Sequence, residues 1–223
     1  MNLFGTFFYH ISALLSLDWI HRCYTKWASQ SHPEPDLVGY HLTNLSCMVY
    51  FSVVGTATWI SKGVRSSWIH YALIWPMYHY QSWNLVTSLQ HDSLSDIASL
   101  FHHTATMLLS LLAISYPVLE YPAIYMIGPF EVSSIFLTLH NLFDINPQWK
   151  ERYRWIHTGN KLLFATCFLG IRIVGMIYYL GRYFLTLQPL LMSIIAPFLC
   201  LQFFWAYQII RILIHTLPSV TNS

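Results

Sequence analysis

Long stretches of the chain carry no charged side chain, and this pattern predicts its helices. Windows without Asp, Glu, Lys or Arg cover residues 1–17, 37–61, 66–91, 97–119, 121–130, 132–143, 162–171 and 183–210. About 20 consecutive apolar residues cross a bilayer as an α-helix, and several windows reach that length. The pattern therefore predicts six transmembrane helices, at 41–60, 67–87, 97–117, 121–143, 160–181 and 189–212.

Residues 1–17 are apolar as well and lie near the lower length limit for a transmembrane helix. A cleaved signal peptide is not expected there, because no positive region precedes the apolar run and no A-x-A site follows it. The segment 28–36 contains two prolines and mostly polar residues, which predicts a surface loop. The expected fold is an all-α, polytopic membrane bundle with six core transmembrane helices and an N-terminal seventh.

Composition and domain organisation agree with a membrane protein. Only 9% of the residues are charged, against roughly 25% in soluble domains. The net charge of +2 comes without a basic stripe, so the expected partner is the lipid bilayer and not a nucleic acid. Four scattered cysteines without a CxxC motif predict neither a disulfide framework nor a zinc site. We expect an N-terminal segment and loop at 1–36, a transmembrane domain at 37–215 and a tail at 216–223.

Positive charges near the helix ends predict the orientation, because Lys and Arg are enriched on the cytosolic side. With seven spans, one side collects Arg22, Lys26, Lys150, Arg152, Arg154, Lys161 and Arg211, and the other side holds Lys62, Arg65 and Arg182. This asymmetry predicts a cytosolic C-terminus. It also places the loops 18–40, 88–96 and 144–159 in the cytosol.

The third predicted span contains two adjacent histidines beside a polar helix face. Spacings of three and four residues place four side chains on that face: Ser99, His102, Thr106 and Ser110. His103 lies about 100° around the helix from His102. An ionisable residue inside the bilayer costs roughly 2.5–3.5 kcal/mol on insertion scales. The two imidazoles either hydrogen-bond between helices or mark a functional cavity, and we favour the cavity.

Single charges stand near the middle of the fourth and fifth predicted spans, at Glu131 and Arg172. Two opposite charges at similar depth can neutralise each other as a buried ion pair, and we predict that pair here. The face of Glu131 continues at i+3, i+7 and i+10 with Ser134, Thr138 and Asn141. The pair either clamps the fold or orients a ligand.

The second predicted span contains an aromatic and partly polar segment from Trp75 to Asn84. Pro76 within it favours a kink, because proline removes a backbone hydrogen bond. An aromatic belt at the membrane interface accounts for most of the segment. Only His79 is kept as a candidate substrate-binding residue.

Three segments on consecutive predicted spans resemble the TLC domain family (TRAM, Lag and CLN proteins), multi-pass membrane proteins mostly of the endoplasmic reticulum. The first has an acid, an apolar stretch and a double histidine, in Asp96, His102 and His103, and is similar to the opening of the Lag motif of ceramide synthases. The second, residues 130–136, is similar to an E-x-S-x-x-F segment of small TLC-domain proteins. The third, residues 168–173, is similar to their F-x-x-x-R-I/V helix.

The resemblance covers residues 40–212 and includes the segment 110–116 that follows the histidines. Ceramide synthases continue the Lag motif with H-D-x-x-D, whereas this chain has FEVSS at 130–134, with Glu131 as the only acid. The chain therefore resembles the small TLC-domain proteins more than true ceramide synthases. The resemblance implies a membrane protein of the endoplasmic reticulum that acts in lipid metabolism.

For function, the resemblance implies an acyltransferase related to ceramide and sphingolipid synthesis, with acyl-CoA as co-substrate and no tightly bound cofactor. Imidazole suits the required general base because its pKa lies near neutrality. The catalytic candidates are His102, His103 and Glu131. The substrate-binding candidates are Arg172, Ser134, Thr106 and His79.

Three other functions stay open, and the least favoured is a transporter, because the sequence shows no pair of Gly/Pro-broken half helices in matching positions. A non-catalytic lipid-binding regulator, or a chaperone or cargo receptor, would hold a long-chain lipid in the same cavity. A membrane di-iron oxygenase is less favoured despite twelve histidines, because its iron ligands cluster in motifs such as HxxxH. No two histidines of this chain have i+3 or i+4 spacing, and the sequence predicts no metal site.

Overall fold

The computed structural model describes residues 3–61, 66–183 and 189–220, and within these ranges every regular element is helical. The first α-helices are α1 (Leu3–Ala28), α2 (Pro35–Ser61), α3 (Ser66–Ile69), α4 (Trp75–Gln90), α5 (Ile97–Ser115) and α6 (Glu120–Ile127). The remaining α-helices are α7 (Pro129–Asp144), α8 (Pro147–Arg152), α9 (Arg154–Cys167), α10 (Val174–Tyr183) and α11 (Pro189–Val220). Two π-helical turns, η1 (His70–Ile74) and η4 (Phe168–Ile173), and two 3₁₀ turns, η2 (Asp92–Leu94) and η3 (Pro117–Leu119), connect them. The predicted all-α class is confirmed.

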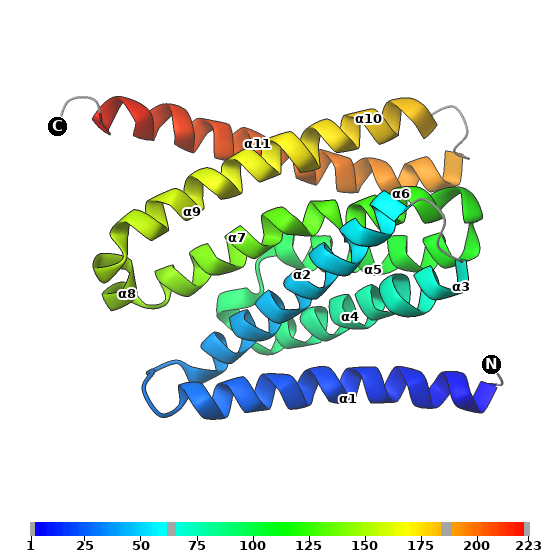
Figure 1. Ribbon diagram of the computed structural model, residues 1–223, viewed down its shortest axis with the longest axis horizontal. Helices are drawn as coiled ribbons and strands as arrows, with labels where there is room; N and C mark the ends of the chain where they lie inside the picture. Colours follow the sequence, from blue (N-terminus) through cyan, green and yellow to red (C-terminus); the bar gives the residue numbers. More distant parts are fainter. Residues whose placement is uncertain (1–2, 62–65, 184–188, 221–223) are drawn as a thin grey trace.

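The helices form an elongated bundle (Figure 1). Helix α1 lies along one edge and packs against α2, and α2 also packs against α7. Helices α4 and α5 pack side by side behind α2. At the opposite edge, α9, η4 and α10 form one long rod beside α11, which also contacts α5. Helix α7 therefore lies between α2 and the α9–η4–α10 rod, in the middle of the bundle.

Five helical stretches are long and apolar enough to cross a membrane. They are Pro35–Ser61, Ile97–Ser115, Pro117–Asp144, Arg154–Tyr179 and Ile195–Ile214. These stretches coincide with five of the six predicted spans. The chain is therefore consistent with a multi-pass membrane protein.

The predicted span at 67–87 is helical but is not one of these five. The helix continues from Ser66 through η1 to Gln90, and its buried polar side chains, including Gln81 and Asn84, lower its hydropathy. Helix α1 has 26 residues but is not one of the five either. The predicted count of six core spans and the N-terminal seventh are thus not confirmed.

The described part of the bundle buries polar side chains and exposes large apolar ones. Asn84 and Gln202 are completely buried, whereas Val53, Ile60 and Ile212 are each 64% exposed. In water, so much exposed apolar surface would favour aggregation. In a bilayer the same surface contacts lipid tails, and polar side chains hydrogen-bond between helices. The distribution therefore fits a membrane environment.

Several connections lie at one end of the bundle. The loop between α1 and α2, helix α8 and the C-terminal end of α11 lie together at the left in Figure 1. The predicted topology places the same segments on one side of the membrane. Which side faces the cytosol stays a prediction. Lys62 and Arg65, which entered the charge comparison, lie outside the described residues, as do residues 221–223 of the predicted tail.

Two glycines allow a close helix crossing at the centre of the bundle. A Cβ atom at Gly55 in α2 would overlap the backbone of Gly128, and a Cβ atom at Gly128 would overlap the backbone of Gly55. Only residues without a side chain can pack at that distance. Gly128 is also the residue between α6 and α7, where Pro129 begins the second helix. The crossing therefore holds the start of α7 against α2.

Candidate functional site

Two cavities of different character meet inside the bundle. The larger, which we call the polar cavity, has a volume of about 700 Å³ and is lined largely by polar side chains of α2, α5 and α7. The smaller, the apolar chamber, has a volume of about 110 Å³ and is lined mainly by apolar side chains of α5, α6 and α11. Three residues line both cavities: His102, Glu131 and Arg172. The structure thus brings together three of the residues singled out from the sequence.

Arg172 forms the predicted ion pair with Glu131. Its Nη2 atom lies 3.8 Å from Glu131 Oε2, and both side chains are less than 10% exposed. Nη2 also donates hydrogen bonds to the hydroxyl oxygen of Ser134 at 2.7 Å and to the carbonyl oxygen of Phe130 at 3.1 Å. Nη1 donates to Gln202 Oε1 at 3.4 Å. The guanidinium therefore has neutral acceptors in addition to the carboxylate, which lowers the free-energy cost of its burial.

The π-helical turn η4 contains Arg172. A π-turn inserts an extra residue into the helical repeat, and such insertions occur frequently at functional sites. Two aromatic rings lie close to the guanidinium carbon, Phe168 at 5.2 Å and Phe130 at 5.6 Å between Cζ and the ring centroid. These cation–π contacts add attraction in a desolvated environment. They fix the guanidinium at the junction of the two cavities.

The predicted polar face of α7 lines the polar cavity. It consists of Glu131, Ser134, Thr138 and Asn141. Asp144, which follows Asn141 by three residues at the end of α7, also lines this cavity. The periodicity of the sequence was therefore sufficient to identify this wall. Ser134 itself is engaged by Arg172.

The predicted polar face of α5 extends from one cavity to the other. Ser99 and His102 line the polar cavity, whereas Thr106 and Ser110 line the apolar chamber together with His102. The His102 ring stacks on Phe198 with a centroid distance of 5.7 Å. Among the described residues, neither His102 Nδ1 nor Thr106 Oγ1 has a hydrogen-bond partner. Both polar atoms are therefore buried and unsatisfied.

His103 forms a hydrogen bond with the side-chain amide of Gln81, a residue that the sequence analysis did not single out. Its Nδ1 atom lies 2.7 Å from Gln81 Oε1. Because an amide oxygen only accepts hydrogen bonds, Nδ1 carries the proton in this contact. The amide nitrogen of Gln81 donates to Met77 Sδ, which agrees with that orientation of the amide. A neutral His103 therefore has its lone pair on Nε2, the nitrogen that can accept a proton.

Glu131 does not orient an imidazole. Its ionic partner is Arg172, and within the described ranges no hydrogen bond or ion pair joins its carboxylate to His102 or His103. The part of Glu131 as a catalytic candidate therefore stays a prediction. The Glu131 carboxylate lies where it can neutralise the charge of the Arg172 guanidinium.

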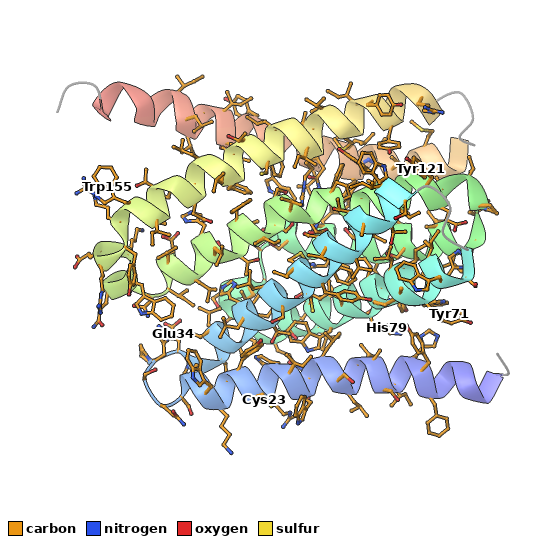
Figure 2. The ribbon with its side chains drawn as sticks, viewed as in Figure 1. Cys23, Glu34, Tyr71, His79, Tyr121 and Trp155 are labelled. Atoms are coloured by element: carbon orange, nitrogen blue, oxygen red, sulfur yellow. The ribbon has the colours of Figure 1, made fainter. Side chains whose placement is uncertain are left out.

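His79 lies away from both cavities. Its side chain is buried on the side of α4 that faces α1 (Figure 2). Its Nε2 atom is 2.5 Å from His10 Nδ1, and the Tyr9 ring packs edge-on against it with a centroid distance of 5.6 Å. His79 joins α1 to the bundle, and neither cavity includes it in its lining.

Sequence reasoning missed several polar residues of the site, among them Gln81, His41 and Gln202. Gln81 and His41 line the polar cavity, and Gln202 is completely buried beside Arg172. All three stand inside charge-free windows. An uncharged amide in an apolar span is a weaker signal than a charge, although it also requires a hydrogen-bond partner in the membrane.

Two further donor groups beside the site have no partner within the described part of the chain. They are Arg172 Nε and Gln202 Nε2. A buried donor without an acceptor costs about 1–3 kcal/mol, and a ligand oxygen would remove that cost. The site therefore combines a basic imidazole nitrogen with unsatisfied donors beside an apolar chamber. Comparisons of the chain with protein-family models, with curated protein sequences and with solved structures find no match.

Proposed function

We propose that this protein binds an amphipathic long-chain lipid across the junction of the two cavities and transfers an acyl group there. The observation that carries the proposal is that His102, Glu131 and Arg172 line both the polar cavity and the apolar chamber. A lipid with its polar end in the first cavity and its hydrocarbon in the second places its polar–apolar boundary beside these residues. Acyl carbonyl groups of lipids lie at that boundary.

The chemistry follows from the hydrogen bonds of the site. His103 Nε2 removes the proton from an acceptor hydroxyl or amine, whose oxygen or nitrogen attacks the thioester carbonyl carbon of an acyl-CoA. The carbon–sulfur bond then breaks, and the leaving thiolate takes the proton back from the imidazolium. Arg172 Nε, which has no partner in the described structure, donates to the oxygen on which negative charge develops.

The acyl-CoA substrate also has a place in this arrangement. The charged head of acyl-CoA cannot enter the hydrocarbon region, so it remains at the mouth of the polar cavity. The lining of this cavity extends to Asp96, the N-cap of α5, and to Asp144, the last residue of α7. We place this end in the cytosol, in agreement with the charge asymmetry. The resemblance to TLC-domain proteins supports an endoplasmic reticulum membrane.

The direct test uses purified full-length protein, labelled long-chain acyl-CoA, and a long-chain amine or a lysophospholipid as acceptor. Loss of the general base in His103→Gln reduces transfer by about 10²- to 10⁴-fold. Gln81→Leu leaves the base in place but removes the amide that holds its Nδ1 proton, so the loss of transfer should be smaller than in His103→Gln. The matched control is His91→Gln, at the residue that connects α4 to η2 and lines neither cavity.

A second candidate is a lipid-binding regulator without catalysis, and the partner of Glu131 favours it. General-base histidines are commonly oriented by a carboxylate, whereas this carboxylate pairs with Arg172. Native mass spectrometry on the same samples separates the two functions. Retained lipid without transfer, equal in wild type and His103→Gln, supports the regulator and contradicts the acyltransferase. Absence of both transfer and bound lipid contradicts both functions.

A further inference from the structure

Three metal-ligating side chains converge where α7 ends and α9 begins. His140 and Asp144 lie one turn apart on α7, and His157 lies in the first turn of α9. One ligand atom from each side chain lies within 4.8 Å of the other two. The short helix α8 reverses the chain direction between them. Periodicity along one helix did not predict this cluster, because its second histidine lies 17 residues after the first.

The spacing of the two imidazoles fits a shared ion. His140 Nδ1 and His157 Nε2 are 3.1 Å apart. Two nitrogens that bind a tetrahedral zinc ion at about 2.0–2.1 Å are separated by about 3.3 Å, so hardly any movement is needed. Asp144 Oδ1 lies 3.9 Å from His157 Nε2, and the other oxygen of this carboxylate, Oδ2, lies 3.4 Å from His140 Nε2.

We infer that His140, Asp144 and His157 form a binding site for a divalent transition-metal ion such as zinc. Two imidazoles and one carboxylate are a ligand set that zinc accepts, and three protein ligands leave a fourth position open. His157 is buried, whereas Asp144 is exposed and lines the polar cavity. The open position therefore lies near that cavity. The site is independent of the proposed acyl transfer.

The ammonium group of Lys150 competes with the metal ion for the carboxylate of Asp144. Its Nζ atom lies 2.7 Å from Asp144 Oδ1, so it neutralises the carboxylate that the ion needs. Lys161, one turn after His157 on α9, places a second positive charge nearby. A divalent ion binds when Lys150 turns away toward solvent, where its half-exposed side chain has room. Removal of the Lys150 charge should therefore make the protein bind the metal ion more tightly.

The experiment uses full-length protein purified in detergent with a histidine-free affinity tag and stripped with a chelator. Zinc titration is expected to show one saturable site per chain, and cobalt is expected to give the absorption bands of nitrogen and oxygen coordination. Asp144→Asn and His140→Asn should weaken zinc binding by more than about 100-fold, since loss of a supporting partner alone costs 10- to 100-fold. Lys150→Met should strengthen it, and His91→Asn is the matched control.

Melting temperatures of the stripped proteins separate loss of a ligand from loss of folding. The inference is overturned if folded Asp144→Asn and His140→Asn proteins keep wild-type zinc affinity. It is equally overturned if wild type shows no saturable zinc binding, or if calcium, which prefers oxygen ligands, binds as tightly as zinc. An unchanged affinity in Lys150→Met contradicts the proposed competition.

Discussion

At the residue scale, the Arg172 guanidinium determines how the two cavities join. It lies between a carboxylate, a hydroxyl and a backbone carbonyl, and two phenyl rings flank it. Charges in such a place are tolerated because their partners compensate for the lost hydration. The closest acceptor is the hydroxyl of Ser134 and not the carboxylate of Glu131, so the arginine stays partly satisfied without its counter-charge.

Removal of either charge should destabilise the protein more than removal of both. Glu131→Gln and Arg172→Gln each leave one buried charge without its partner, a change that costs about 3–5 kcal/mol in dry interiors. Because the pair borders a polar cavity, we expect the lower end of that range. The double variant should recover part of the loss, seen as non-additivity in thermal unfolding.

The matched control is Arg22→Gln in α1. Arg22 pairs with Asp18, but its side chain is 77% exposed, and surface pairs contribute about 0–1 kcal/mol. Strictly additive losses in the double variant would show that Glu131 and Arg172 act separately despite their proximity.

At the element scale, two structural features bring the residues of the site together. The Gly55–Gly128 crossing fixes the start of α7 against α2, and the π-turn η4 carries Arg172 toward α7. Without these two features the polar faces of α5 and α7 would still exist. They would not meet Arg172 at one junction.

Gly55→Ala should lower stability although alanine is the better helix former. The new methyl group would overlap the Gly128 backbone, and overpacking of this kind costs about 1–3 kcal/mol. Gly159→Ala in α9 is the control, because no atom lies within 4 Å of the added Cβ there. That control should gain up to about 1 kcal/mol from helix propensity. Equal melting temperatures for the two variants would contradict the close crossing.

At the scale of the whole molecule, the distribution of polarity is inverted relative to a soluble protein. Polar side chains such as Gln81 and Gln202 are buried, and large apolar side chains cover much of the described surface. The two cavities are therefore enclosed by helices whose outer faces suit lipid.

The arrangement predicts that the α1–α2 loop and α8 face the same side of the membrane. Ser31→Cys and Glu151→Cys, each in a background without native cysteines, should react with a membrane-impermeant thiol reagent from the same side of sealed vesicles. Reaction from opposite sides would contradict a membrane-spanning role for α2 through α7 as arranged here. Detergent-solubilised vesicles provide the reference for complete labelling.

The linear sequence determined the properties that depend on neighbours along one helix. Charge-free windows located five helices long enough to cross a membrane, and spacings of three and four residues identified the polar faces of α5 and α7. The necessity of neutralising two deep charges identified the Glu131–Arg172 pair. These inferences succeed because helix geometry and the cost of buried charge are local rules.

Only the tertiary structure decided what lies between helices. It supplied Gln81 for His103, moved His79 to the contact with α1, and brought His157 to His140 and Asp144. Such contacts depend on helix crossings, on the two glycines that permit one of them, and on a π-turn that shifts the helical repeat. Residues distant in sequence meet through packing, which periodicity along a single helix does not encode.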